Sequence, residues 1–226
     1  MILIQKVTRV FLVLMLLSTA AIAAPSEKWS ETKARDWYAK QPWLVGSNYN
    51  PASAINQLEM WQADSFDPKR IDLELGWAES LGMNTMRVYL HDLLWEQDAE
   101  GFKRRLNEFL TIASRHGIRP IFVLFDSVWD PDPKVGKQRP PKPGVHNSGW
   151  IQSPSRTRLQ ATAEHAQLEA YVKGVVGAFA KDERVLAWDI WNEPDNENQG
   201  SYGHLEPKNK VELVLALLPK AFAWAR

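Results

Sequence analysis

The stretch VLAWDIWNEP occupies residues 185–194, where an apolar run with two tryptophans ends directly on Asn192, Glu193 and Pro194. A short apolar run that is rich in β-branched and aromatic residues is typical of a buried strand. Three earlier runs have the same character, and they lie at residues 44–49 (LVGSNY), 84–90 (NTMRVYL) and 119–126 (RPIFVLFD). The sequence therefore predicts four strands, the last of which ends on a carboxylate.

Amphipathic segments separate these strands. They are expected at residues 29–40, 67–82, 102–117 and 156–181, and from residue 208 onward. Asp67 and Pro68 suit the N-cap and the first position of a helix, and Gly82 and Gly117 suit helix ends. Pro219 should kink or end the last helix, because proline lacks the backbone N–H that a helix interior needs.

The alternation of apolar strands with helices indicates parallel strands covered by helices. No GxGxxG sequence follows a strand and no Walker A sequence is present, which argues against a nucleotide-binding fold. The expected fold class is therefore α/β, of the (β/α)8 barrel type. A complete barrel has eight strands and typically about 250 residues. We therefore expect a half barrel of about four strands, spanning residues 24–226.

The composition limits the classes of partner. The 226 residues include 27 basic and 27 acidic side chains, which argues against nucleic acid or an anionic membrane as the main partner. The absence of cysteine excludes a disulfide scaffold and a thiolate zinc site. The five histidines form no HExxH motif or close pair, so neither a metal nor another cofactor is expected. Nothing in the sequence indicates the oligomeric state.

The first residues have the pattern of a secretory signal. Lys6 and Arg9 precede an apolar run at 10–17, and Ala21 and Ala23 fit a small-x-small cleavage site. Residues 1–23 are therefore expected to be a signal peptide of a secreted or periplasmic protein. An uncleaved anchor is the alternative, although the apolar run is short for a membrane span.

The period of two in the second strand predicts which side chains face the barrel interior. Met86, Val88 and Leu90 form the apolar face, so Arg87 should point inward, on the side of Glu193. A guanidinium there needs carboxylates or other acceptors. The side chains of Asn192 and Glu193 would face opposite sides of a regular strand, and they can serve one site only if the strand end bends.

One long connection, residues 127–155, follows the third strand. It contains many prolines and glycines, so it cannot form a regular element. Because it leaves the C-terminal end of a strand, where barrel enzymes carry their chemistry, we expect it to form a cleft wall. Its Trp129, His146 and Trp150 are candidates for contact with substrate, and tryptophan rings are flat platforms of the kind on which sugar rings pack.

The motif WDIWNEP, together with the arginine of MRVYL, resembles clan A of the glycoside hydrolases, most closely glycoside hydrolase family five. The resemblance implies a (β/α)8 barrel in which Glu193 is the general acid/base and Asn192 binds the sugar 2-hydroxyl. It places Arg87 beneath the catalytic carboxylates. The segment NYNPASAIN, residues 48–56, lies where the first strand reaches the cleft, without an assigned role.

Arg87 and two further residues are candidates for substrate contact. His91 lies at the end of the second strand, and Trp191 flanks Glu193 in the motif. Asp126 ends the third strand and could position substrate, whereas Asp189 suits a structural bond.

The expected function is a retaining glycoside hydrolase that acts on a β-linked carbohydrate. Retention needs a second carboxylate as nucleophile. In the family this glutamate lies on the seventh strand, which this chain does not contain, so the chain alone is expected to be inactive. A non-catalytic carbohydrate-binding protein is the alternative.

Overall fold

The computed structural model describes residues 28–200 and 202–226. The expected signal peptide, residues 1–23, lies outside these residues. Within the described part of the chain, no helix has both the length and the apolar character needed to cross a bilayer.

Four parallel strands form one sheet in chain order. They are β1 (Gly46–Tyr49), β2 (Thr85–Tyr89), β3 (Arg119–Asp126) and β4 (Ala187–Asn192). Each strand pairs with the next one along the chain. The predicted strands and their parallel order are thus confirmed, with ends that differ by two residues or fewer.

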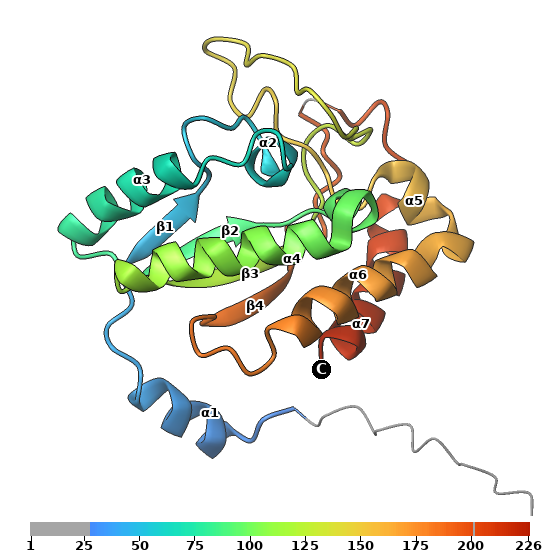
Figure 1. Ribbon diagram of the computed structural model, residues 1–226. Helices are drawn as coiled ribbons and strands as arrows, with labels where there is room; N and C mark the ends of the chain where they lie inside the picture. Colours follow the sequence, from blue (N-terminus) through green and yellow to red (C-terminus); the bar gives the residue numbers. More distant parts are fainter. Residues whose placement is uncertain (1–27, 201) are drawn as a thin grey trace, which may run out of the picture.

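Helices cover one face of this sheet (Figure 1). The helical elements are α1 (Glu31–Ala39), α2 (Gln57–Trp61), α3 (Pro68–Ser80), α4 (Asp92–Arg115), α5 (Arg156–Gln160), the 3-10 turn η1 (Thr162–Glu164), α6 (His165–Ala178) and α7 (Lys210–Ala225). Helices α3, α4, α6 and α7 pack side by side in that order, as the strands do. The result is half of a barrel wall, with these four helices packed along one face of the sheet.

The predicted helix signals around α3 are confirmed. The side chain of Asp67 accepts a hydrogen bond from the backbone N–H of Arg70, and Pro68 is the first helical residue. Gly82 follows the helix with a φ of 79°, and Gly117 follows α4 with a φ of 65°. Both angles lie in the left-handed region that glycine adopts readily.

Two expectations about the later helices are wrong: residues 156–181 do not form one helix, and Pro219 does not end α7. The predicted helix over residues 156–181 is interrupted at Ala161, which has a ψ of 81°. Arg158 in α5 binds Asp92 and Glu96 of α4, and this tertiary contact holds α5 apart from α6. Helix α7 continues through Pro219 to Ala225. Proline leaves the carbonyl of Leu215 without its helical donor, but Leu215 is exposed, so water can replace that donor.

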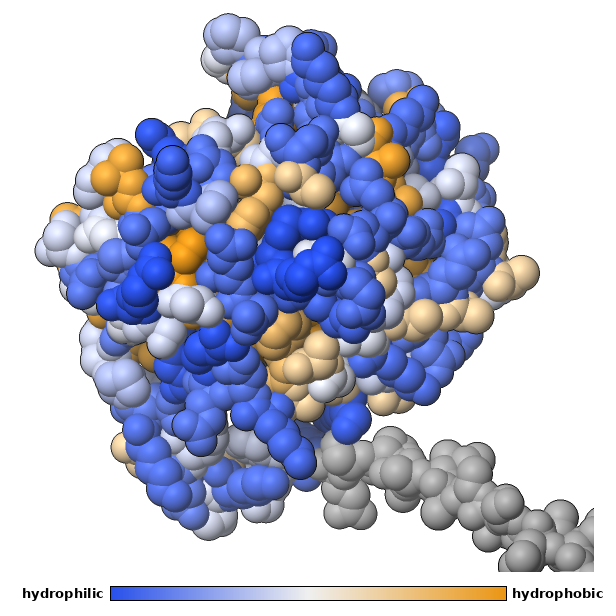
Figure 2. Space-filling view, in the orientation of Figure 1, coloured by the Kyte–Doolittle hydropathy of each residue, from blue (hydrophilic) through white to orange (hydrophobic). Residues whose placement is uncertain are grey.

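The main core lies between the sheet and the helices. Trp61 is fully buried, and its ring packs within 6.0 Å of the ring of Phe102 and 5.4 Å of that of Phe109, centroid to centroid. Its indole nitrogen donates a hydrogen bond to the carbonyl of Tyr89 at 2.9 Å, so α2 is fastened to the end of β2. The outer surface in Figure 2 is mainly hydrophilic, with small apolar areas between the polar side chains.

Gly46 allows the closest approach of β1 to β2. A Cβ atom at this position would lie 2.0 Å from the carbonyl oxygen of Thr85, which is backbone and cannot turn away. Gly46→Ala is therefore expected to destabilise the protein by about 1–3 kcal/mol through overpacking. Urea unfolding measures this change, and Gly177→Ala, where the added Cβ meets nothing within 4 Å, is the control. Equal stability of both variants and the wild type would contradict the argument.

Candidate active site

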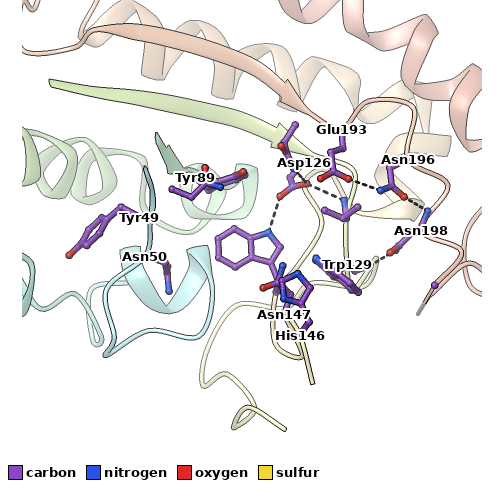
Figure 3. Close-up of a pocket in the computed structure, with 15 residues that line it drawn as sticks. Tyr49, Asn50, Tyr89, Asp126, Trp129, His146, Asn147, Glu193, Asn196 and Asn198 are labelled. Atoms are coloured by element: carbon purple, nitrogen blue, oxygen red, sulfur yellow. Dashed lines mark hydrogen bonds between the residues drawn. The ribbon is translucent and has the colours of Figure 1, made fainter. Parts of the chain in front are cut away.

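A cavity of about 510 Å³ lies at the C-terminal ends of the strands, a size typical of small-molecule sites. Its lining comes from all four strand ends and from the two loops that follow β3 and β4 (Figure 3). The lining residues are Asn48, Tyr49, Asn50, Tyr89, Asp126, Val128, Trp129, His146, Asn147, Trp150, Asn192, Glu193, Asn196, Asn198 and Gly200. The described cavity thus combines neutral amides and aromatic rings with two carboxyl groups.

Glu193 follows directly on β4 and has an unusual backbone conformation. Its φ is 49°, which non-glycine residues rarely adopt, and the following Pro194 further favours an extended backbone at this position. A site shared by Asn192 and Glu193 requires the strand end to bend. The backbone does bend here, and both side chains line the cavity. Such strained residues cluster at functional sites. The Glu193 side chain is solvent-exposed, and its Oε2 accepts a hydrogen bond from Asn196 Nδ2 at 2.6 Å.

Arg87 lies on the inner face of the sheet, as the alternation of β2 predicts. Its Nε and Nη2 donate to Asp189 Oδ2 at 2.9 and 2.5 Å, and Nη2 also donates to Asn192 Oδ1 at 3.0 Å. Its guanidinium also binds the hydroxyl of Tyr89 and lies over that ring. Asp189, rather than Glu193, is therefore the carboxylate that pairs with this guanidinium. Arg87 itself supports Asn192 and does not line the cavity.

The alternation of β4 is interrupted before its end. Asp189 and Asn192 are three residues apart, yet both contact Arg87. Regular alternation would place Trp191 on the same face of the sheet as Asp189. Trp191 instead packs against Phe125, with ring centroids 4.9 Å apart. Its indole nitrogen donates to Ser127 Oγ at 2.8 Å. The structure therefore places Trp191 in the buried core, outside the cavity where a sugar contact was expected.

His91 also lies outside the cavity, contrary to the expected contact with substrate. The side chain is fully buried. Its Nδ1 accepts a hydrogen bond from the N–H of Leu93 at the start of α4, and its Nε2 lies 3.0 Å from the carbonyl oxygen of Gln152. This histidine caps a helix and ties the long loop to it. A strand-end position alone could not distinguish this role from substrate contact.

Asp126 ends β3, lines the cavity and is almost fully buried. Its Oδ1 accepts hydrogen bonds from Asn192 Nδ2 at 3.0 Å and from the N–H of Val128 at 3.1 Å, and its Oδ2 accepts one from Trp150 Nε1 at 2.8 Å. Burial raises the pKa of Asp126 from its ordinary value of 3.8 to about 7, and the charge of Glu193 acts in the same direction, whereas the three donors oppose the shift.

This pKa gives the stability of the protein a pH dependence. Because the pKa of Asp126 is higher in the folded chain than in the unfolded one, its contribution is fully present below about pH 4 and is lost as the pH rises to about 7. We expect the free energy of unfolding of the wild type, relative to that of Asp126→Asn, to fall over this window by up to a few kcal/mol. Urea unfolding at several pH values tests this, and a difference that is constant or rises with pH would contradict it.

The long loop forms one wall of the cavity, as expected. A bridge between Asp126 and Ser153 ties the last part of the loop to the end of β3, and a bridge between Asp130 and Ile151 joins the two ends of the loop to each other. Within it, the rings of Trp129 and His146 meet edge to face at 5.5 Å. The three loop residues expected to contact sugar, Trp129, His146 and Trp150, all line the cavity.

Several cavity residues had no assigned role in the sequence. Asn48, Tyr49 and Asn50 stand at and just after the end of β1, so their place after a predicted strand was the available signal. Asn196 and Asn198 lie in the loop after β4, and no pattern marked them. Asn198 Nδ2 donates to the carbonyl of Trp129 at 2.5 Å, which joins the two loops. Among the described residues, no group of three His, Asp or Glu side chains is placed to hold a metal ion.

Comparison with models of protein families finds no match, and comparison with curated protein sequences finds none either. Among solved structures, the chain is similar to an exo-β-1,4-mannosidase from Opitutaceae bacterium strain TAV5. The TM-score is 0.50 and the identity 21%, and the match covers 79% of this chain and 29% of that chain.

Two further structures are similar with lower scores. GH5_18 from Streptomyces cattleya in complex with GlcNAc matches with a TM-score of 0.49 and 13% identity, over 80% of this chain and 42% of that one. The endo-β-1,4-mannanase from Thermotoga petrophila matches with a TM-score of 0.40 and 14% identity, over 66% and 34%.

The match to the mannosidase confirms the resemblance at the level of the fold. The chain spans about 29% of the length of that protein, and its four parallel strands with their helices correspond to part of a glycosidase barrel. At 21% identity the likeness speaks for the fold alone.

Proposed function

We propose that the cavity binds a β-linked carbohydrate and that Glu193 is the general acid/base of a retaining glycoside hydrolase. The observation that carries the proposal is the left-handed backbone at Glu193, which brings its carboxylate and the Asn192 amide into one cavity. A glycosidase needs a carboxylic acid to protonate the leaving oxygen and then a base to activate water, and one glutamate can serve both steps.

The rest of the lining supports a sugar as the ligand. Trp129, Trp150 and Tyr89 offer ring faces and edges to the apolar faces of a pyranose, and asparagine amides both donate and accept hydrogen bonds with hydroxyl groups. Asn192 Oδ1 and one Nδ2 proton are already engaged by Arg87 and Asp126. One Nδ2 proton is left for the sugar 2-hydroxyl. Because the similar structure is a β-1,4-mannosidase, β-mannosides are the first substrates to test.

A retaining mechanism also needs a second carboxylate, which acts as the nucleophile. A retaining pair stands about 5 to 5.5 Å apart, with one member free to attack the sugar. Asp126 is the other carboxyl group in the described cavity, and it already accepts three hydrogen bonds. Its position suits support rather than attack. The nucleophile is therefore proposed to be a residue outside this chain. Residues 1–23 are proposed, separately, to be the signal peptide that directs export.

Residues 24–226 alone are consequently expected to bind a β-1,4-linked oligosaccharide without hydrolysing it. Calorimetry with mannotetraose and cellotetraose measures the binding, and release of reducing ends measures the hydrolysis. Glu193→Gln, prepared in the same way, controls for a contaminating hydrolase. Turnover by a monodisperse monomer that disappears in Glu193→Gln would refute the missing nucleophile and make Asp126 the next candidate for it.

The alternative function is a non-catalytic carbohydrate-binding protein, for which the aromatic and amide lining would suffice. The exposed Glu193 on a strained backbone favours the enzyme, because a binding protein gains little from a strained residue that carries an acid. Hydrolysis of an aryl β-mannoside by a form of the protein that also carries a second catalytic carboxylate separates the two functions. Absence of turnover there, with binding retained, would support the binding protein.

A further inference from the structure

Asp126 connects two parts of the cavity that come from distant parts of the chain. One of its oxygens binds the amide of Asn192 at the end of β4, and the other binds the indole of Trp150 in the long loop. Trp150 in turn meets Tyr89 edge to face at 5.1 Å. Figure 3 shows the Asp126 carboxylate in the cavity, with dashed lines for hydrogen bonds that it accepts.

The contacts determine the orientation of the Asn192 amide. Its Oδ1 accepts from the guanidinium of Arg87, which has donors only, so the Nδ2 group must face Asp126. Trp150 has a single polar atom, the indole N–H, and Asp126 Oδ2 is its acceptor. Without this carboxylate, the Nδ2 group of Asn192 and the indole N–H of Trp150 would each lose an acceptor, and only Arg87 and the ring of Tyr89 would still hold the two side chains.

We propose that Asp126 is a positioning residue, which holds the Asn192 amide and the Trp150 indole in place so that both face the cavity. A carboxylate fits this task because it accepts from several donors and donates to none. An asparagine would turn its NH₂ group toward either the Trp150 indole or the Asn192 and Val128 donors. The positioning is a property of the cavity itself, whereas its effect on sugar binding rests on the proposed function.

The role depends on the ionised form of Asp126, because a proton on either oxygen removes an acceptor site. Titratable groups on three other elements face this carboxyl group. They are Glu193 after β4, which raises its pKa, Tyr89 on β2 and the buried Lys210 on α7. Arg87 acts on it through Asn192. The pKa of Asp126 is about 7, so the two donors should respond together near neutral pH.

A pH titration of the two donors by ¹H–¹⁵N NMR tests the proposal. The indole signal is identified by its loss in Trp150→Phe, which keeps an aromatic ring, and the amide signals by their loss in Asn192→Ala. We expect the Trp150 and Asn192 signals to shift with one common midpoint near pH 7. Different midpoints, or a shift of one signal without the other, would overturn the positioning role.

Three variants show whether the common shift comes from Asp126. In Asp126→Asn the common shift should vanish, whereas Asp64→Asn, which changes an exposed aspartate, should leave it unchanged. In Glu193→Gln the common midpoint should fall, because a neighbouring negative charge has been removed. A shift that persists in Asp126→Asn would overturn the proposal. If this variant does not fold, the midpoints of the wild type still decide the question.

Calorimetry with mannotetraose separates this role from the proposed function. If the wild type binds the oligosaccharide, Asp126→Asn should weaken that binding roughly tenfold or more, because the charged hydrogen bonds to Asn192 and to Trp150 are both disturbed. If no oligosaccharide binds the wild type but the two signals still titrate together, the positioning role stands and the carbohydrate function fails. Binding that is unchanged in Asp126→Asn, in a protein that binds sugar, would count against the positioning role.

Discussion

Replacement of Glu193 by glutamine is expected to lower hydrolysis of β-mannosides with poor leaving groups by about 10²–10⁴-fold, the range of general acid–base catalysis. The measurement needs the form of the protein that contains the second carboxylate, with phenyl and dinitrophenyl β-mannosides as substrates. The dinitrophenyl substrate needs no protonation of its leaving group, so its glycosylation step should lose far less. Glutamine has nearly the same shape, so binding of mannotetraose should change little.

Glu197→Gln is the matched control for this experiment. Glu197 lies in the same loop after β4 but is not among the residues that line the described cavity, and its Oε2 accepts a hydrogen bond from the neighbouring Gln199. This variant should retain the activity of the wild type. Equal losses for the two substrates in Glu193→Gln, or a comparable loss in Glu197→Gln, would remove Glu193 from the acid/base role.

Replacement of Lys210 by methionine is expected to destabilise the fold by about 3–5 kcal/mol, as removal of one partner of a buried ion pair does. Lys210 Nζ donates to Glu206 Oε1 at 2.6 Å, to the carbonyl of Ser127 at 2.5 Å and to Gln152 Oε1 at 3.1 Å. The side chains of this ion pair are 2% and 3% exposed. Without the ammonium group, the Glu206 carboxylate would remain buried and would lose the cation of this ion pair.

The double variant Lys210→Met, Glu206→Gln should lose less stability than Lys210→Met alone, because no buried charge is left over. Lys208→Met, which changes an exposed lysine two residues away, should stay within about 0.5 kcal/mol of the wild type. Urea unfolding measures all three. Because Glu206 also binds Asn198, Lys210→Met should weaken mannotetraose binding as well. A loss below about 1 kcal/mol in Lys210→Met would contradict a buried ion pair of this importance.

The sequence was sufficient for those features that depend on local pattern. Apolar runs predicted four parallel strands, and the signals at Asp67, Pro68 and Gly82 predicted a helix with nearly its observed ends. The period of two in β2 predicted the inward direction of Arg87. For Asn192 and Glu193, the sequence set only a condition: the two adjacent side chains can share one cavity only if the strand end bends.

The tertiary structure decided which polar and aromatic side chains reach the cavity. His91 and Trp191 had the right positions along the chain, but one caps α4 and the other packs on Phe125. The α5–α6 break depends on the pairing of Arg158 with residues more than sixty positions earlier. Asp126 joins Asn192 and Trp150 across strands and loop. Hydrogen bonds and packing between distant segments set these directions, and a local period contains no information about partners that only the folded chain brings together.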